Sequence, residues 1–98
     1  MIRVMLPSPL RALAKIEGEL ALSIDGPVTM NAVIDAVEVQ FPALRGTIRD
    51  PATGRRRPYL RYFVCNEDWS DESLDAPLPG PIVAGAEPLL VVGAVSGG

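Results

Sequence analysis

The sequence predicts an α+β fold, in which a mixed sheet of about four to five strands carries one main helix packed across one face. Three segments alternate apolar and polar side chains with the two-residue period of a strand that has one inward face. A fourth segment, between the second and third of these strands, has the spacing of an amphipathic helix. One helix lying across a sheet is the simplest arrangement that buries both apolar faces together.

The three alternating segments define the expected inner face of the sheet. Its residues are Ile2, Val4 and Leu6, then Leu20, Leu22 and Ile24, and then Leu60, Tyr62 and Val64. We predict that the first two strands pair with each other. Between them, Leu10–Glu17 has the composition of a short helical turn ended by Gly18. We expect a short irregular strand near Trp69 and a loop from Trp69 to Pro81.

The main helix is predicted after a turn at Asp25-Gly26-Pro27, with Thr29 as its N-cap. Pro42 should end it, because a proline disfavours helical geometry in the residue before it. The apolar stripe of this helix follows the spacing i, i+3, i+4, i+7, i+11 and consists of Met30, Val33, Ile34, Val37 and Phe41. We interpret this stripe as core-facing.

The aliphatic run Leu89–Val92 predicts the last strand. We expect it to lie parallel to the first strand at the centre of the sheet, where a strand is buried on both faces. A register slip of one residue would exchange the two faces. The sequence therefore leaves open whether Leu89 and Val91, or Leu90 and Val92, are exposed.

Length and charge limit the classes of function. The chain of 98 residues predicts a single small domain, residues 1–98, with a flexible C-terminal Gly-Gly tail. The net charge of -3 argues against a nucleic-acid partner. No apolar run approaches the roughly 20 residues of a membrane span, and the first residues lack the layout of a signal peptide. With one cysteine and hence no internal disulfide, we expect a cytoplasmic protein.

The absence of histidine removes whole classes of catalytic site. Ser-His and Cys-His nucleophile pairs and histidine metal sites are impossible, and one cysteine cannot build a thiolate zinc site. We therefore expect no metal site. We interpret Glu67-Asp68 and Asp71-Glu72 as solvated loop charge. We interpret Arg55–Arg57 as a solvated loop tip rather than a contact for phosphate or for an acidic partner. Cys65 has no adjacent cationic residue to activate its thiol.

Several segments together resemble the MoaD/ThiS family of ubiquitin-like, β-grasp sulfur carrier proteins. The matching segments are Arg3–Leu6 with Leu10-Arg11, Phe41–Leu44, Asp50-Pro51 with Gly54, Asn66–Asp68, and the ending Ala94–Gly98. Asp50-Pro51 and Asn66–Asp68 are most similar to the branch that carries sulfur for cysteine synthesis. The chain departs from the family in having Gly93 where proline is common, Pro88 where an apolar residue is common, and one inserted residue near Gly85.

The resemblance implies a carrier protein rather than an enzyme. The Gly98 carboxylate would be adenylated by an ATP-using, E1-like adenylyltransferase and converted by a sulfur donor into a thiocarboxylate. A sulfur-accepting biosynthetic enzyme of the cysteine, molybdopterin, thiamin or a related pathway would then use the sulfur. The ATP belongs to the activating partner, so no stably bound cofactor is implied. The residues expected to contact the partners are Gly97, Ser96, Val95, Ala94 and Val92.

Two other functions fit the same tail. A ubiquitin-like modifier would be joined through Gly98 to target lysines, although Lys15 as the single lysine disfavours polymeric tags. A plain interaction module would have a tail that is never activated.

Overall fold

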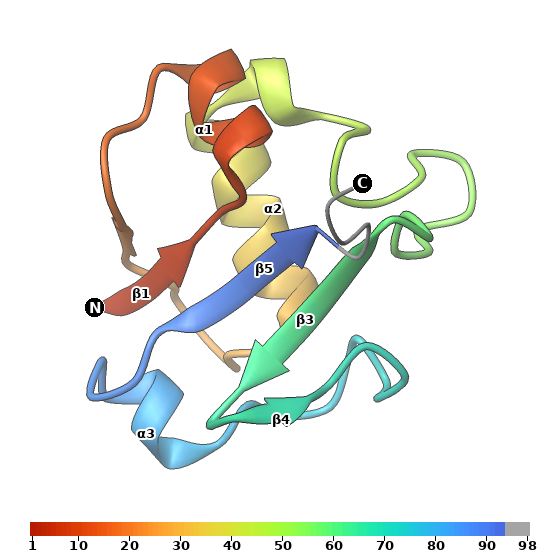
Figure 1. Ribbon diagram of the computed structural model, residues 1–98. Helices are drawn as coiled ribbons and strands as arrows, with labels where there is room; N and C mark the ends of the chain where they lie inside the picture. The colour runs from red at the N-terminus through yellow and green to blue at the C-terminus, as the bar shows by residue number, and fades with distance from the viewer. Residues whose placement is uncertain (94–98) are drawn as a thin grey trace.

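A computed structural model describes residues 1–93 of the chain. The elements follow in the order β1 (Ile2–Met5), α1 (Ser8–Ala14), β2 (Leu20–Leu22), α2 (Met30–Gln40), η1 (Pro42–Leu44), β3 (Leu60–Val64), β4 (Glu67–Asp68), α3 (Gly80–Val83) and β5 (Leu89–Gly93) (Figure 1). The strands form one mixed sheet in the order β2-β1-β5-β3-β4. The predicted α+β class and strand number are therefore confirmed.

The last strand lies at the centre of this sheet, as predicted. β5 runs parallel to β1, with Val4 opposite Leu89, and antiparallel to β3, with Tyr62 opposite Val91. The first two strands pair antiparallel, as expected, with α1 lying between them in the chain. This arrangement brings the two ends of the described chain into neighbouring strands.

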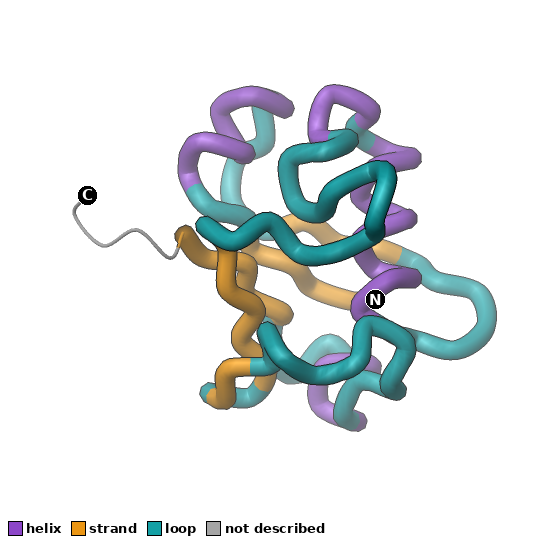
Figure 2. The backbone as a smooth tube through the Cα atoms, turned by 90° about the vertical axis from the view of Figure 1, so that its right-hand side faces the viewer, coloured by secondary structure: helices purple, strands orange, loops and turns teal. Residues whose placement is uncertain are grey.

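The main helix also forms as predicted and covers one face of the sheet. The Thr29 hydroxyl accepts a hydrogen bond from the Ala32 amide at 3.1 Å, which caps α2. In Figure 1 α2 lies behind β5 and β3, and in Figure 2 no described helix crosses the opposite side of the sheet. The buried core joins the helix stripe to the inner face of the sheet: Ile2, Val4, Leu6, Leu20, Leu22, Met30, Val33, Ile34, Val37, Leu60, Tyr62, Val64, Leu89 and Val91.

Three predicted boundaries were wrong. The second strand was expected to include Ile24, but β2 ends at Leu22. The first helix begins earlier, at Ser8, because Pro9 fits a first helical turn, and it ends where Lys15 takes a left-handed conformation with φ 58°. The predicted loop up to Pro81 is interrupted by α3, which starts after Pro79 and buries Ile82. Such single-turn helices leave too short a pattern for periodicity to detect.

The short strand expected near Trp69 lies just before that residue, as β4. Because β4 consists of Glu67 and Asp68, the interpretation of these two residues as loop charge was wrong: they pair with β3, and Asp68 bonds to Arg61. β4 is joined to β3 by a two-residue turn, Cys65 and Asn66, whose φ angles of 51° and 67° are both positive. Two positive φ angles are typical of the type I′ turn, which matches the twist of a hairpin.

The helices in the described part of the chain are all too short or too polar to cross a membrane.

Candidate functional site

Of the predicted partner-contacting residues, the structure describes Val92. Ala94, Val95, Ser96, Gly97 and Gly98 lie outside the described residues. Val92 belongs to β5, the last described strand, and precedes Gly93. The surroundings of β5 are therefore the part of the candidate site that the structure describes.

The register of β5 decides which of its side chains are available to a partner. Leu89 and Val91 are 1% and 3% exposed and pack into the core. Leu90 and Val92 are half-buried on the opposite face, which we call the outer face. The expectation that this central strand is buried on both faces was wrong, because no described helix covers the outer face (Figure 1).

An apolar row crosses the outer face. Met5 and Phe63 are the direct neighbours of Leu90 in β1 and β3, and directly opposed residues in a sheet share a face. Val92 extends the row by one step along β5. We call Met5, Phe63, Leu90 and Val92 the outer-face patch. All four are half-buried, so each retains apolar surface that a partner could cover.

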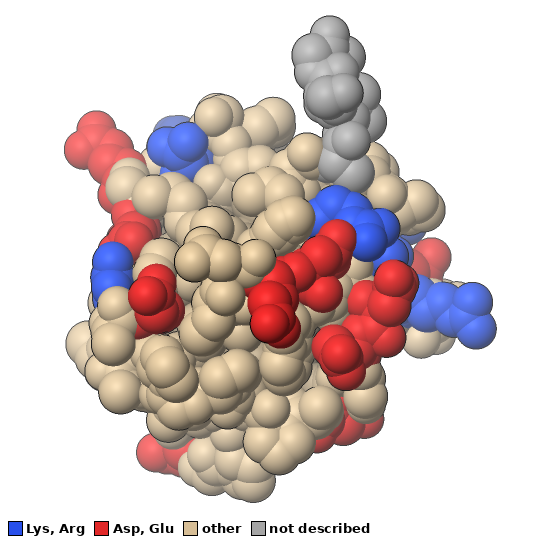
Figure 3. All heavy atoms as spheres, turned by 60° about the horizontal axis from the view of Figure 1, so that its bottom comes forward, with Lys and Arg blue, Asp and Glu red and all other residues tan. Residues whose placement is uncertain are grey.

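Ion pairs flank this patch on both sides. At one side, Arg3 Nε and Nη2 donate to the two carboxylate oxygens of Glu19, each at 3.0 Å. At the other side, Arg61 Nε and Nη2 donate to Asp68 at 2.9 and 2.7 Å. Figure 3 shows two groups of neighbouring basic and acidic side chains separated by uncharged surface. An apolar centre with a charged rim is typical of a protein-docking surface.

Hydrogen bonds keep the Asp68 carboxylate at this rim in its charged form. Bonds from the Ser70 side chain and backbone amide, and then from Arg61, lower the pKa of Asp68 to about 2. The Ser70 amide donates to Asp68 Oδ1 at 2.8 Å, and the Ser70 hydroxyl accepts from the Tyr62 amide at 2.9 Å. Ser70 therefore links this surface carboxylate to the buried part of β3.

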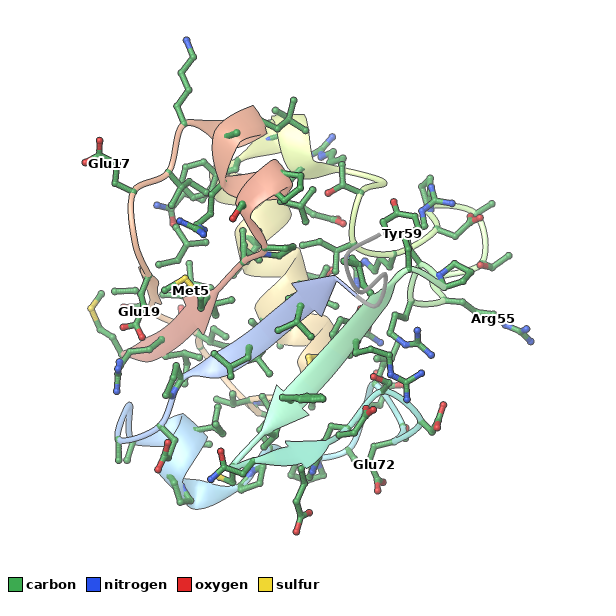
Figure 4. The ribbon with its side chains drawn as sticks, in the orientation of Figure 1. Met5, Glu17, Glu19, Arg55, Tyr59 and Glu72 are labelled. Carbon is green, nitrogen blue, oxygen red and sulfur yellow. The ribbon has the colours of Figure 1, made fainter. Side chains whose placement is uncertain are left out.

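An apolar hollow of about 300 Å3 lies beside the end of β5. It is lined by Pro7, Pro9, Leu10, Tyr59, Leu60 and Gly93. Tyr59 lies just before β3 (Figure 4), and its hydroxyl donates to the Thr47 carbonyl at 3.2 Å. Because Gly93 forms part of the wall, the chain leaves the described region directly at this hollow.

The sequence reasoning missed Met5, Phe63 and Tyr59, and it left Leu90 open together with the register of the last strand. The two-residue period of the strand already places Phe63 on the other face of the sheet from Tyr62 and Val64. The sequence therefore contained the information that Phe63 lies outside the core. The four residues come together only because of which strands are neighbours and how these strands are aligned. The alternation of residues within one strand gives no information on either point.

The basic cluster predicted as a solvated loop tip is solvated only at Arg55, which points away from the molecule in Figure 4. For Arg56 and Arg57 the prediction was wrong. Both are half-buried and donate to backbone carbonyls, of Leu60 at 2.6 Å and of Gly46 at 2.8 Å. These arginines hold the loop before β3 in place. Among the described residues, no group of three acidic, cysteine or histidine side chains could hold a metal ion.

Comparison with known proteins identifies the architecture. Neither protein-family models nor curated proteins match the sequence. A chain of the crystal structure of the Amycolatopsis orientalis BexX/CysO complex superposes with a TM-score of 0.74 at 21% identity, covering 100% of both chains. The fold is a ubiquitin-like β-grasp. SAMP1 from Haloferax volcanii superposes on it with a TM-score of 0.68 at 18% identity, covering 98% of this chain and 97% of that one. This β-grasp similarity agrees with the family that the sequence resembles.

Proposed function

We propose that the protein is a sulfur carrier, whose Gly98 carboxylate is adenylated by an ATP-using, E1-like enzyme and converted into a thiocarboxylate. The sulfur then passes to a biosynthetic enzyme, in the cysteine pathway or a related one. The protein acts as a co-substrate in the cytoplasm, and its outer-face patch docks on the partners.

The observation that carries this proposal is the position of the outer-face patch. Leu90 and Val92 belong to the strand that leads into the Gly-Gly ending, so a partner that covers the patch also receives the tail. Glycines without Cβ atoms let a tail pass through a narrow channel. The BexX/CysO complex, a structure of similar fold, gives further support that a β-grasp chain of this kind works bound to a second protein.

The chemistry requires little from this chain beyond its carboxylate. A carboxylate is a poor acyl donor, so one of its oxygens attacks the α-phosphorus of ATP and pyrophosphate leaves. A sulfur nucleophile then adds to the acyl carbon, and AMP leaves with the electron pair of the broken C–O bond. The chain has no histidine and one cysteine, and this agrees with a protein that is activated by its partner.

Intact-mass spectrometry tests the proposal. The protein is purified from cells that also make its activating enzyme, and from cells that lack it. We expect a mass gain equal to the exchange of one oxygen for one sulfur, in the first sample alone. A covalent adduct at a target lysine would favour a modifier instead, and an unchanged mass beside an active partner would contradict both activated roles.

Docking is tested separately with a matched pair of surface variants. Val92→Lys places a charge within the outer-face patch, whereas Val39→Lys places the same charge on α2, away from the patch. We expect sulfur loading to fall with Val92→Lys and to stay unchanged with Val39→Lys. Equal loading of both variants would show that the outer face does not dock.

A further inference from the structure

A second surface, remote from the outer-face patch, lies at the free edge of the sheet. β2 is an edge strand, with β1 as its single neighbour in the described sheet. Directly after it, Ser23, Ile24 and Asp25 take part in none of the backbone hydrogen bonds described outside helices and strands. An edge strand with free backbone groups is a template for pairing with another extended chain.

Two adjoining hollows lie beside this edge. Both are lined by Leu22, Ser23 and Ile24, and their volumes are about 240 and 490 Å3. The smaller also contacts Met1 and Val83, and the larger lies against α2. We call the two together the β2–α2 groove.

The helix side of the groove is a second apolar stripe on α2, of which Ala36 also packs against the edge of the core. Ala32, Ala36 and Val39 follow the spacing i, i+4, i+7 on α2 and line the larger hollow. The two alanines are short, and this leaves room between the helix and the edge strand. Val39 is 75% exposed, although its position on the groove would let a bound chain cover it.

Exposed apolar side chains concentrate at this groove. Of the five large hydrophobic residues exposed in the described chain, three line it, namely Met1 at 71%, Val39 at 75% and Val83 at 43%. Single exposed hydrophobic residues are ordinary, but a contiguous set along a groove marks an interaction site.

The charges beside the groove indicate which kind of partner fits it. Asp25 and Asp35 line the larger hollow, and the lining residues described for both hollows include no lysine or arginine. Asp35 pairs with Arg49, but Arg49 also pairs with Glu38, so these three side chains together keep a net negative charge. A second copy of this chain would bring identical carboxylates together, which destabilises strand pairing. A basic partner would meet complementary charge.

We propose that the β2–α2 groove binds an extended segment of another protein, which adds as a strand to the free edge of β2 and alternates apolar with basic side chains. Its backbone pairs with β2, its apolar side chains fill the groove beside Val39, and its basic side chains face Asp25 and Asp35. This interaction uses neither Gly98 nor the outer-face patch, so a partner held here could remain bound during sulfur transfer.

The test uses 15N-labelled full-length protein without any activating enzyme. The probe is a five-residue peptide that alternates lysine with valine, blocked at both ends. We expect saturable amide shifts confined to the groove and its two flanking elements, residues 1–2, 20–28, 32–40 and 83. A peptide with glutamate in place of lysine should bind at least about tenfold more weakly. Each substitution replaces an attraction between lysine and the groove carboxylates by a repulsion.

Matched variants locate the site. Val39→Lys should weaken binding by about tenfold, the scale of losing a central apolar contact, whereas Leu13→Lys, at an exposed hydrophobic residue on α1, should not. Asp25→Asn should weaken binding ~2–5-fold and reduce its salt dependence. A chain lacking Gly98 should bind the peptide as tightly as the intact chain, although it cannot be loaded with sulfur. A failure of peptide binding can therefore be distinguished from a failure of sulfur loading.

Three outcomes would overturn the proposal. They are shifts centred on Leu90 and Val92, equal binding of the glutamate peptide, and concentration-dependent self-association through residues 20–25 in the absence of peptide.

Discussion

Gly85 lies in the connection from α3 to β5, near the residue inserted relative to the family that the sequence resembles. Its φ is +77°, and a Cβ built there would lie 2.5 Å from the Met1 carbonyl oxygen. The close contact is with backbone, which cannot rotate away as a flexible side chain would. Glycine at this position therefore lets the start of β1 and the approach to β5 lie side by side.

The first prediction compares two glycines that share a left-handed conformation. Gly18→Ala should cost the ~1–2 kcal/mol of placing an L-residue there, because a Cβ at Gly18 meets nothing within 4 Å. Gly85→Ala should cost more, because the steric clash adds to the same backbone strain. Urea unfolding measures both free energies of unfolding, and equal losses would contradict the close contact at Met1.

Tyr62 is fully buried, and its hydroxyl has no hydrogen-bond partner in the described structure. Burial raises the pKa of Tyr62 to about 12. A buried hydroxyl without a partner costs about 1–3 kcal/mol of desolvation. We expect Tyr62→Phe to leave the free energy of unfolding unchanged or to raise it. A loss above about 1 kcal/mol in urea unfolding would mean that the hydroxyl is bonded.

Asp68 offers a pH test of the rim. Its pKa is lowered to about 2 by Ser70 first and then by Arg61, so the folded state binds a proton less readily than the unfolded state. Its contribution to stability is therefore complete above the ordinary pKa of 3.8 and is lost as the pH falls toward about 2. Carboxyl 13C shifts should give a midpoint near 2, and Arg61→Gln should raise it. An ordinary midpoint would contradict the hydrogen bonds.

At the scale of elements, β5 places a core face and the half-buried outer face on adjacent residues. Val91 is 3% exposed in the core, and Val92 is half-buried on the outer face. Val91→Ala should cost about 2 kcal/mol through lost burial and a cavity, whereas Val92→Ala should stay within about 0.5 kcal/mol. Urea unfolding measures both. A reversed order would mean that the faces of β5 are exchanged.

The sequence predicted well the elements that are long enough to repeat their apolar pattern several times. α2 has 11 residues with an apolar stripe, an N-cap before them and a proline after them, and β3 alternates over five residues. α3 has four residues, too few for a period. The faces of Leu89–Val92 depended on pairing with β1 and β3, which are contacts between strands far apart in the sequence.

At the scale of the whole molecule, one helix across a five-stranded sheet leaves two surfaces uncovered by described helices. The outer face leads from Leu90 and Val92 toward the Gly-Gly ending, and the β2–α2 groove lies at the far edge strand. The two surfaces differ in composition: the outer-face patch lies between ion pairs, and the groove carries acidic groups. We therefore expect the two surfaces to bind partners of different chemistry.

The most direct test of the account compares sulfur loading of the intact chain with that of a chain lacking Gly98 and a chain extended by one residue. Each is incubated with ATP, the activating enzyme and a sulfur donor, and its intact and fragment masses are measured. The account predicts one oxygen-to-sulfur exchange, located at Gly98 in the intact chain and absent from both variants, while all three melt at nearly the same temperature. Sulfur at another residue, or loading of an extended chain that no protease has trimmed, would contradict it.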